Sequence, residues 1–294
     1  MTTNYYKPLE LINPESRNII LKLQRLKDAS DFENMQRQNV FFIVLILEGS
    51  GTITADTTEY FFQKNSIITF SLYQPFIIKA AENFRATMVN FHPELFCLHK
   101  HRREVSCNGI LFNNIYESPV MQLSQVEAKI LLNVFNGMES EMQQIGKPDA
   151  EVLISFLKIL LISASRLKVT KHSETAASPN FHNAEAIENM RAAIEKHFRS
   201  EHSPGYYAEL LHITPSALNR IAKTYFNKTL TNLIAERLIT EGKRELYLTS
   251  KPVKEIAYQL GFNDEFYFSR FFKNNVGISP QGFRDTVGFD KANA

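Results

Sequence analysis

Short apolar runs separated by turn residues dominate the chain from residue 40 to about residue 91. β-Branched and aromatic residues fill runs such as VFFIVLIL, EYFFQ and SIITFS, and EGSG, DTT and KN interrupt them. This composition and run length predict successive antiparallel strands. Strands joined by tight turns form a small sandwich or barrel, whose interior is either filled by side chains or encloses one small ligand. The pattern leaves both interiors open.

After Pro119 the apolar spacing becomes helical. The stretch LSQVEAKILLNVFNGMESEMQQ opens with Ser124 and Glu127, three residues apart as in a capping box. A second helix is expected after Pro148, with a predicted apolar face of Val152, Phe156, Ile159, Leu160 and Ser163. Such a helical hairpin either packs on its own sheet domain or forms a dimer seam. The next stretch, KHSETAASP, is small, polar and aperiodic, which predicts a linker.

The last third of the chain is almost wholly helical in pattern and contains an internal repeat. LNRIAK at 218–223 and FSRFFK at 268–273 share the order apolar, small polar, Arg, two apolar, Lys, at an offset of 50 residues. In each copy a short amphipathic helix precedes a turn, and an N-capping residue, Thr214 or Asp264, opens the next helix. Gly261 suits a left-handed turn between the helices of the second copy. The pattern predicts two helix-turn-helix units.

Each predicted second helix has one apolar and one polar face. Leu218 and Ala222, like Phe268 and Phe272, are spaced i to i+4 and are expected to be buried. The opposite faces carry polar residues suited to contacts with bases and phosphates: Asn219, Arg220, Lys223, Ser269, Arg270 and Lys273. Two such helices in successive major grooves lie roughly 34 Å apart. The predicted helix 231–248 would span roughly 27 Å, which is the right order for a spacer between them.

These residues resemble the DNA-binding domain of AraC/XylS-type transcription regulators. The stretch IAYQLGFNDEFYFSRFFKNNVGISPQGFR carries the resemblance, which covers about 100 residues and includes IA, GF, YFSRFFK, the G-x-S-P turn and a closing aromatic-Arg pair. The resemblance implies that bases are contacted by the following positions of this chain: Ser216, Asn219, Arg220, Glu265, Phe266, Ser269 and Arg270.

Two positions depart from the family pattern. Ala222 stands where a bulky aromatic residue is usual, and Phe266 stands where a polar or small residue is frequent. Phe266 is expected to pack in the protein, with contact to a thymine methyl group as the alternative. Glu265 either accepts a hydrogen bond from cytosine N4 or acts as a favourable acid in the first helical turn.

The N-terminal half resembles, by pattern alone, the cupin-like effector barrel of the same family. In that family the barrel binds a small molecule or mediates dimerisation, and either event changes DNA affinity. The resemblance therefore implies double-stranded DNA as a partner, with RNA polymerase, a small-molecule effector and a second copy of the chain as further expected partners.

The formal net charge of only +2 gives no global indication of a nucleic-acid partner. Residues 1–182 carry 18 charges of each sign, whereas residues 219–254 carry eight basic and three acidic residues. The basic excess is therefore local. Two cysteines and no membrane-spanning or secretory pattern favour a cytoplasmic protein.

Enzymatic and metal chemistry are weaker hypotheses. A cupin-type metalloenzyme needs histidine ligands on barrel strands, but no histidine precedes His92. Five potential soft or imidazole ligands do lie within sixteen residues: His92, Cys97, His99, His101 and Cys107. Their spacing matches no familiar zinc finger, so no metal site and no cofactor are predicted. A third hypothesis is an interaction module without DNA binding, but such a module should lose the basic side chains of both polar faces.

The sequence as a whole predicts a multidomain α+β protein that is not an enzyme. Residues 1–170 are expected to form a cupin-like β-barrel with a helical hairpin, residues 171–182 a linker, and residues 183–288 an all-α tandem helix-turn-helix domain. The predicted function is sequence-specific DNA binding in transcription regulation, as an activator or as a repressor. The predicted DNA-binding residues are Ser216, Asn219, Arg220, Lys223, Glu265, Ser269, Arg270 and Lys273.

Overall fold

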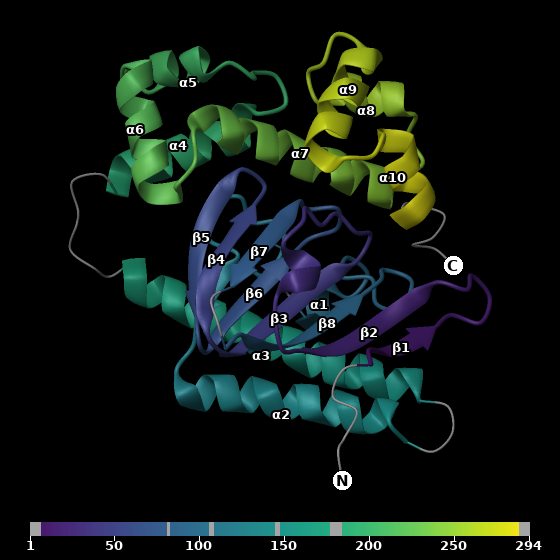
Figure 1. The fold of residues 1–294 in the computed structure, drawn as a ribbon. Helices are drawn as coiled ribbons and strands as arrows, with labels where there is room; N and C mark the ends of the chain where they lie inside the picture. Colours follow the sequence, from purple (N-terminus) through teal and green to yellow (C-terminus); the bar gives the residue numbers. More distant parts are fainter. Residues whose placement is uncertain (1–6, 81–82, 106–108, 145–147, 177–183, 288–294) are drawn as a thin grey trace. The chain divides into compact units, whose positions relative to one another are not determined.

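In the computed structural model, residues 7–80, 83–105, 109–144, 148–176 and 184–287 are described. The chain forms two units, which are considered separately below (Figure 1). Unit 1 comprises Met1–Asn114 and Pro119–Glu174, and unit 2 comprises Ile115–Ser118 and Thr175–Ala294. The short segment Ile115–Ser118, which was expected to lie in the N-terminal domain, therefore belongs to unit 2.

Unit 1 is built on a six-stranded antiparallel sheet. The strand order is β1-β2-β8-β3-β6-β9. Its strands are β1 (Leu9–Ile12), β2 (Ile19–Leu26), β3 (Phe41–Glu48), β6 (Ser66–Phe70), β8 (Arg85–Phe91) and β9 (Val120–Gln122). Strand β3 is central, and residues 41–46 are all buried. A strand with both faces buried requires cover on both sides of the sheet.

A second, three-stranded sheet has the order β5-β4-β7. Its strands are β4 (Ser50–Ala55), β5 (Thr58–Gln63) and β7 (Phe76–Ala80). Both sheets have unpaired edge strands in the part of the chain that the structure describes. A closed barrel would require those edges to pair. The predicted cupin-like barrel is therefore not confirmed, because the described strands form two open sheets.

Aromatic side chains fill the interior of unit 1. Alternate residues of β3, β6 and β8 join residues of the smaller sheet in one buried cluster. The rings of Phe70 and Phe76 stack with centroids 3.9 Å apart, and Phe42 contacts Phe76 edge-on at 5.1 Å. Interlocked rings of this kind combine a large buried apolar area with specific ring geometry. The core is thus packed with side chains, which resolves the choice that the strand pattern left open.

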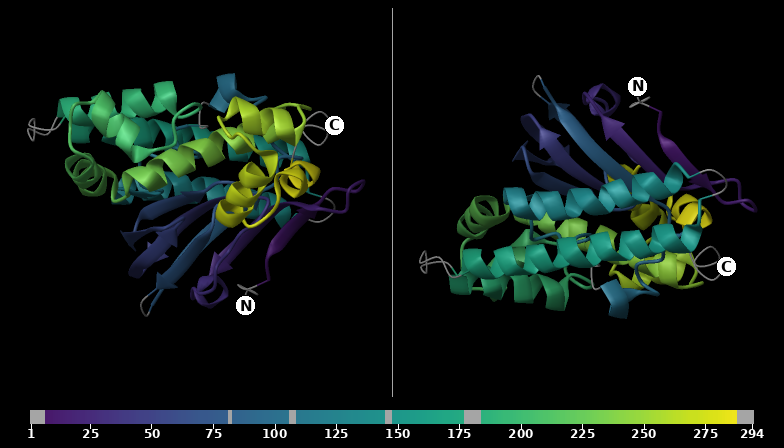
Figure 2. Two further views of the ribbon diagram at one scale, coloured as in Figure 1. Left: turned by 90° about the horizontal axis from the view of Figure 1, so that it is seen from above. Right: turned by 90° about the horizontal axis from the view of Figure 1, so that it is seen from below.

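Two long helices lie side by side in unit 1 (Figures 1 and 2). Helix α2 (Gln125–Met142) begins at the predicted capping box of Ser124 and Glu127, which is confirmed in both of its hydrogen bonds. Helix α3 spans Ala150–Ala176. A β-carbon at Gly137 of α2 would lie 2.5 Å from the ring of Phe156 on α3, so the two helices pack closely. Shorter helices are η1 (Ser30–Phe32) and α1 (Arg102–Val105).

Two predictions about α3 are wrong. Val152 and Ile159 were expected on the buried face but are 39% and 49% exposed. Leu160, which was also predicted, is buried, and the rest of the buried stripe consists of Leu153, Leu157, Leu161 and Ala164. Apolar residues surround most of this helix, so spacing alone did not select the correct face. Residues 171–176, expected as linker, are the last turns of α3, while the rest of the predicted linker lies outside the described residues.

Unit 2 is helical apart from the segment Ile115–Ser118 among its described residues. Its helices are α4 (Ala184–His197), α5 (Pro204–Leu210), α6 (Pro215–Phe226), α7 (Leu230–Leu248), α8 (Val253–Gln259), α9 (Glu265–Val276) and α10 (Pro280–Val287). Helices α5 and α6 form one helix-turn-helix, and α8 and α9 form the other (Figure 1). Helix α7 runs between the two.

The internal repeat is confirmed in the structure. Helices α6 and α9 have 12 residues each, and their first residues are offset by 50 positions. The preceding helices, α5 and α8, have seven residues each and are offset by 49. The second turn is therefore one residue longer than the first.

Candidate nucleic-acid interface

Helices α6 and α9 begin and end with the same kinds of cap: a side-chain N-cap and a left-handed residue at the C-terminal end. The side chain of Thr214 accepts a hydrogen bond from the backbone N–H of Ala217, and that of Asp264 accepts from Phe266 and Tyr267. At the other end, Asn227 and Gly277 have left-handed conformations, with φ of 56° and 89°. Because Asn and Gly tolerate this conformation, they end the helix without strain. Both predicted N-caps are confirmed.

The apolar face of each of these helices is buried as predicted. Leu218 and Ala222 are fully buried on α6, and Phe268 and Phe272 are fully buried on α9. The rings of Phe268 and Phe272 lie 5.8 Å apart. The small residue Ala222 is therefore fully buried in the first unit, at the position equivalent to that of Phe272 in the second.

The opposite faces present the predicted basic side chains to solvent. Arg220 and Lys223 on α6 are exposed, as are Arg270 and Lys273 on α9. Ser216 is also exposed, whereas Glu265 and Ser269 are half-buried at their helix surfaces. Each helix thus offers an Arg and a Lys, three residues apart, on its solvent side. This spacing places both side chains on one helical face.

Asn219 has a role within the protein that the sequence did not indicate. Its side-chain Oδ1 accepts a hydrogen bond from the backbone N–H of Leu230, the first residue of α7, at 3.1 Å. The first N–H groups of a helix have no partner inside that helix, so this contact satisfies one of them. Asn219 therefore joins the exposed helix α6 to the start of the connecting helix. Only the folded chain brings these residues together.

Phe266 is exposed, and the expectation that it packs in the protein is wrong. The residue is 70% exposed at the second position of α9, beside the half-exposed Tyr267. Its equivalent in the first unit, at an offset of 50, is the exposed Ser216. The helical repeat turns both positions away from the core, where Phe268 and Phe272 already fill the apolar face. Contact of Phe266 with a thymine methyl group thus remains available.

The turn of the second unit packs closely against the chain after α4. Gly261 has a φ of +77°, as predicted for a left-handed turn. A β-carbon at this position would lie 2.2 Å from the carbonyl oxygen of Arg199. His202 reinforces the contact, because its ring Nε2 lies 2.8 Å from the carbonyl oxygen of Leu260. Glycine is therefore required for conformation and for space.

Replacing Gly261 by alanine should lower the free energy of unfolding of unit 2 by more than about 1–2 kcal/mol, the usual cost of a left-handed L-residue alone. The close approach to Arg199 adds to that cost. Denaturant unfolding followed by circular dichroism measures the change. Gly109→Ala, followed by the unfolding of unit 1, is the control, since Gly109 has a φ of +83° but a β-carbon there would meet no heavy atom within 4 Å. Equal losses in both variants would show that the packing against Arg199 is unimportant.

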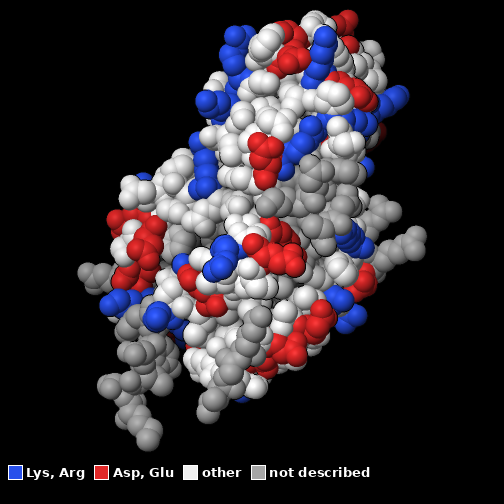
Figure 3. Space-filling view, turned by 90° about the vertical axis from the view of Figure 1, so that its right-hand side faces the viewer, with Lys and Arg blue, Asp and Glu red and all other residues white. Residues whose placement is uncertain are grey.

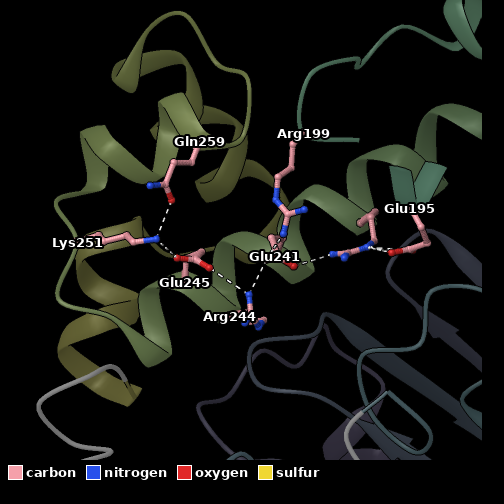
Figure 4. Close-up of polar contacts among 8 residues, drawn as sticks. Glu195, Arg199, Glu241, Arg244, Glu245, Lys251 and Gln259 are labelled. Carbon is pink, nitrogen blue, oxygen red and sulfur yellow. Dashed lines mark hydrogen bonds and ion pairs between the residues drawn. The ribbon is translucent and has the colours of Figure 1, made fainter. Parts of the chain in front are cut away.

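A buried carboxylate on the connecting helix α7 pairs with three arginines (Figure 4). Glu241 is 4% exposed and forms ion pairs with Arg199 at 2.7 Å, Arg244 at 2.7 Å and Arg237 at 3.0 Å. Burial raises the pKa of Glu241, but the hydrogen bond from Arg237 and the charges of the three arginines outweigh it. The net effect holds the pKa of Glu241 below its ordinary value.

The polar network continues from α7 into the second unit. Glu245 pairs with Lys251 at 2.9 Å, and the same ammonium group donates to the side chain of Gln259 on α8 at 2.9 Å. Arg284 on α10 donates to the backbone carbonyl of Lys251. Together with Arg199, these contacts join residues of both halves to the connecting helix. The network therefore ties the chain after α4, helix α8 and helix α10 to α7.

The segment Ile115–Ser118 packs on the first half of unit 2. The ammonium group of Lys228, directly after α6, donates to the carbonyl oxygen of Ile115 at 3.0 Å and pairs with Glu236 at 2.5 Å. Tyr116 donates to Glu195 at 2.9 Å, and its ring lies 5.6 Å from that of Phe226. Burial and the negative charge of Glu195 raise the pKa of Tyr116. No sequence pattern pointed to these contacts.

The proposed cysteine and histidine ligands do not form a metal cluster in the part of the chain that the structure describes. His101 pairs with Glu104 at 2.9 Å and stacks on Phe96, while Cys97 is buried. Cys107 lies outside the described residues. Separately, none of the described helices is long and apolar enough to cross a membrane.

Acidic and basic side chains are interspersed over the molecular face drawn in Figure 3, without one large patch of a single sign. This distribution agrees with the small net charge. On this face, attraction of a nucleic acid would depend on a few placed side chains more than on a broad field.

Two helix-turn-helix units with exposed Arg and Lys side chains, joined by a long helix, define a tandem helix-turn-helix domain. Residues 207–286 match a family model described as a helix-turn-helix domain. The transcriptional activator Btr of Bacillus subtilis is 24% identical over 258 residues, which cover 85% of this chain and 45% of Btr. The transcriptional activator RhaS of Mannheimia succiniciproducens is 29% identical over 167 residues, 53% of this chain and 62% of RhaS. In this C-terminal domain the chain is similar to the AraC/XylS-type regulators.

The matched part of the chain spans about half of Btr and somewhat under two thirds of RhaS. Among solved structures, ToxT from Vibrio cholerae is 14% identical, with a TM-score of 0.41, over 92% of this chain and 98% of ToxT.

Proposed function

We propose that the chain is a sequence-specific transcription regulator that binds double-stranded DNA through helices α6 and α9. The observation that carries the proposal is the structural repeat, which presents Arg220 with Lys223 and Arg270 with Lys273 on two equivalent exposed faces. An Arg guanidinium group can donate two hydrogen bonds to guanine, and a Lys ammonium group suits a phosphate. Core packing alone would not require the same pair of exposed cations in both copies.

The remaining predicted contacts are proposals of the same kind. Ser216, Glu265, Ser269 and Phe266 lie on the exposed or half-exposed surface of the two helices, where they would face bases. Asn219 would act mainly through its contact with the start of α7.

Regulation is proposed to depend on unit 1, through a small-molecule effector or through dimerisation. Two relatives are named transcriptional activators, so we propose activation, with RNA polymerase as a partner. The boundary between the effector region and the DNA-binding domain is proposed to follow Ala176, where α3 ends.

The exposed aromatic residues favour one alternative, an interaction module that binds protein. Phe266 and Tyr267 are neighbours, and both are more than half exposed. The two functions differ in one result: a protein-binding module would select no DNA motif from a random pool. Selection by the purified full chain should instead enrich a motif with two half-elements about one helical turn apart.

Replacing Arg220 or Arg270 by alanine should weaken binding to the selected site by about 1–3 kcal/mol and relax the preference at one base position. Lys223→Ala should weaken binding to all DNA sequences alike. It should also reduce the slope of the logarithm of the binding constant against the logarithm of the salt concentration by about one. Titration of specific and random duplexes at several salt concentrations measures both effects. Lys196→Ala, an exposed change on α4, is the matched control. Equal losses on specific and random DNA for both Arg variants would contradict the assignment of base contacts.

A further inference from the structure

Unit 1 contains a pocket of about 740 Å³ between the end of its larger sheet and helix α2. Leu26 of β2, Ala86 of β8 and Leu47 of β3 line the sheet side. The other side is lined by α2, through Gln125, Ala128, Lys129, Leu132 and Asn136. Residues three, four or seven positions apart share one face of a helix, so these five residues lie on the same face of α2. This pocket borders the buried core, to which Leu26 and Ala86 also belong, and has the size of a site for a small molecule.

Every charged residue that lines the pocket is basic. These residues are Arg25, Lys27, Lys64, Arg85 and Lys129. They come from four parts of the chain: β2 and its end, the turn before β6, β8, and α2. Unit 1 as a whole is close to electrically balanced, since residues 1–182 carry equal numbers of acidic and basic residues. The gathering of five cations around one pocket is therefore a feature of the fold.

Carboxylates outside the lining hold two of these cations in place. Arg25 pairs with Glu139 at 2.6 Å and donates to the side chain of Asn136 at 2.6 Å. Arg85 pairs with Glu48 across the ends of β8 and β3. Even with both carboxylates counted, positive charge remains in excess at the pocket. Fixed guanidinium groups beside an apolar surface favour an anionic group that carries an apolar body.

We propose that this pocket binds a small organic anion, a phosphate ester or a carboxylate with a compact apolar body. The Lys and Arg side chains would pair with the anionic group, and Leu47 and Leu132 would cover the apolar part. A bound anion would connect the ends of β2 and β8 with α2. The regulatory meaning of the site rests on the effector control proposed above, whereas the binding itself does not.

Calorimetric titration of the full chain without DNA tests the proposal. The probes are phenyl phosphate, benzoate, inorganic phosphate and benzyl alcohol, which separate the charge from the ring. We expect saturable binding of phenyl phosphate or benzoate that weakens with salt, and the tighter of the two identifies the anionic group. The proposal would be overturned if benzyl alcohol or inorganic phosphate bound as tightly as phenyl phosphate and benzoate. It would also be overturned if none of the four probes bound.

Paired charge-removing variants locate the site. Lys64→Gln with Lys129→Gln removes two exposed pocket cations and should weaken binding at least about tenfold. Lys79→Gln with Lys196→Gln removes two exposed cations elsewhere and should change affinity little. Equal weakening in both double variants would mean that the anion binds nonspecifically. Since DNA is absent, failure here is distinct from failure of the Arg270→Ala test.

Discussion

Replacing Phe268 by alanine is expected to lower the free energy of unfolding of unit 2 by about 3–5 kcal/mol, the usual cost of deleting a buried aromatic side chain. Phe268 is fully buried, and its ring lies 5.2 Å from that of Phe262 and 5.8 Å from that of Phe272. The change would leave a cavity between α9, α7 and the turn before α9. Because the chain has no Trp, circular dichroism during urea unfolding is a suitable measurement.

Phe266→Ala is the matched control for this prediction. It removes the same side chain from the same helix at a position that is 70% exposed. Its effect on stability should stay within about 0.5 kcal/mol, as for most exposed substitutions. If the two variants were destabilised equally, the assignment of buried and exposed faces on α9 would be incorrect.

Replacing Glu241 by glutamine is the second change with a large expected effect. Removing one partner of a buried ion pair costs about 3–5 kcal/mol, and we expect the lower part of that range because Arg199 and Arg244 are half exposed. Glu188→Gln is the control, because Glu188 forms an exposed pair with Arg191. A loss no larger than that of the control would show that the Glu241 network contributes little.

The Glu241 prediction has a definite dependence on pH. The folded-state pKa of Glu241 is lowered, so its ion pairs stabilise the fold fully above the unfolded carboxyl pKa of about 4.3. This contribution is lost as the pH falls through the folded-state pKa. The difference in unfolding free energy between the wild type and Glu241→Gln should therefore be largest near neutrality and shrink below about pH 4. A constant difference would contradict the role of the charge.

Measuring DNA affinity tests whether Glu241 affects the relative orientation of the recognition helices, which a stability measurement does not report. If the network orients α6 relative to α9, Glu241→Gln should weaken binding to a site with two half-elements more than binding to one half-element. A uniform loss on both duplexes would indicate destabilisation without a change in orientation.

The C-terminal domain was largely predictable because its determinants are local. Thr214 and Asp264 cap their helices by bonding to N–H groups two or three residues away. The i to i+4 spacing of Leu218 with Ala222 and of Phe268 with Phe272 defines the buried face without reference to other elements. The exposure of the Arg and Lys side chains follows from the same periodicity.

Predictions failed where contacts between distant residues decide the outcome. The closure of the N-terminal sheets depends on which strand edges pair, and short strands with similar composition do not encode that choice. Val152 and Leu153 are both apolar, and only the packing of α3 determines which is buried. Phe266 was assigned to packing on its residue type, although its helical position turns it towards solvent.

The sequence by itself determined the helix-turn-helix repeat, its caps, its buried faces and the basic side chains opposite them, because these depend on residues within a few positions of one another. The tertiary structure alone decided the pairing of Glu241 with Arg199, the use of Asn219 at the start of α7 and the gathering of five cations around one pocket. Those features join residues far apart in the chain, and their positions are defined only once the helices and sheets have packed.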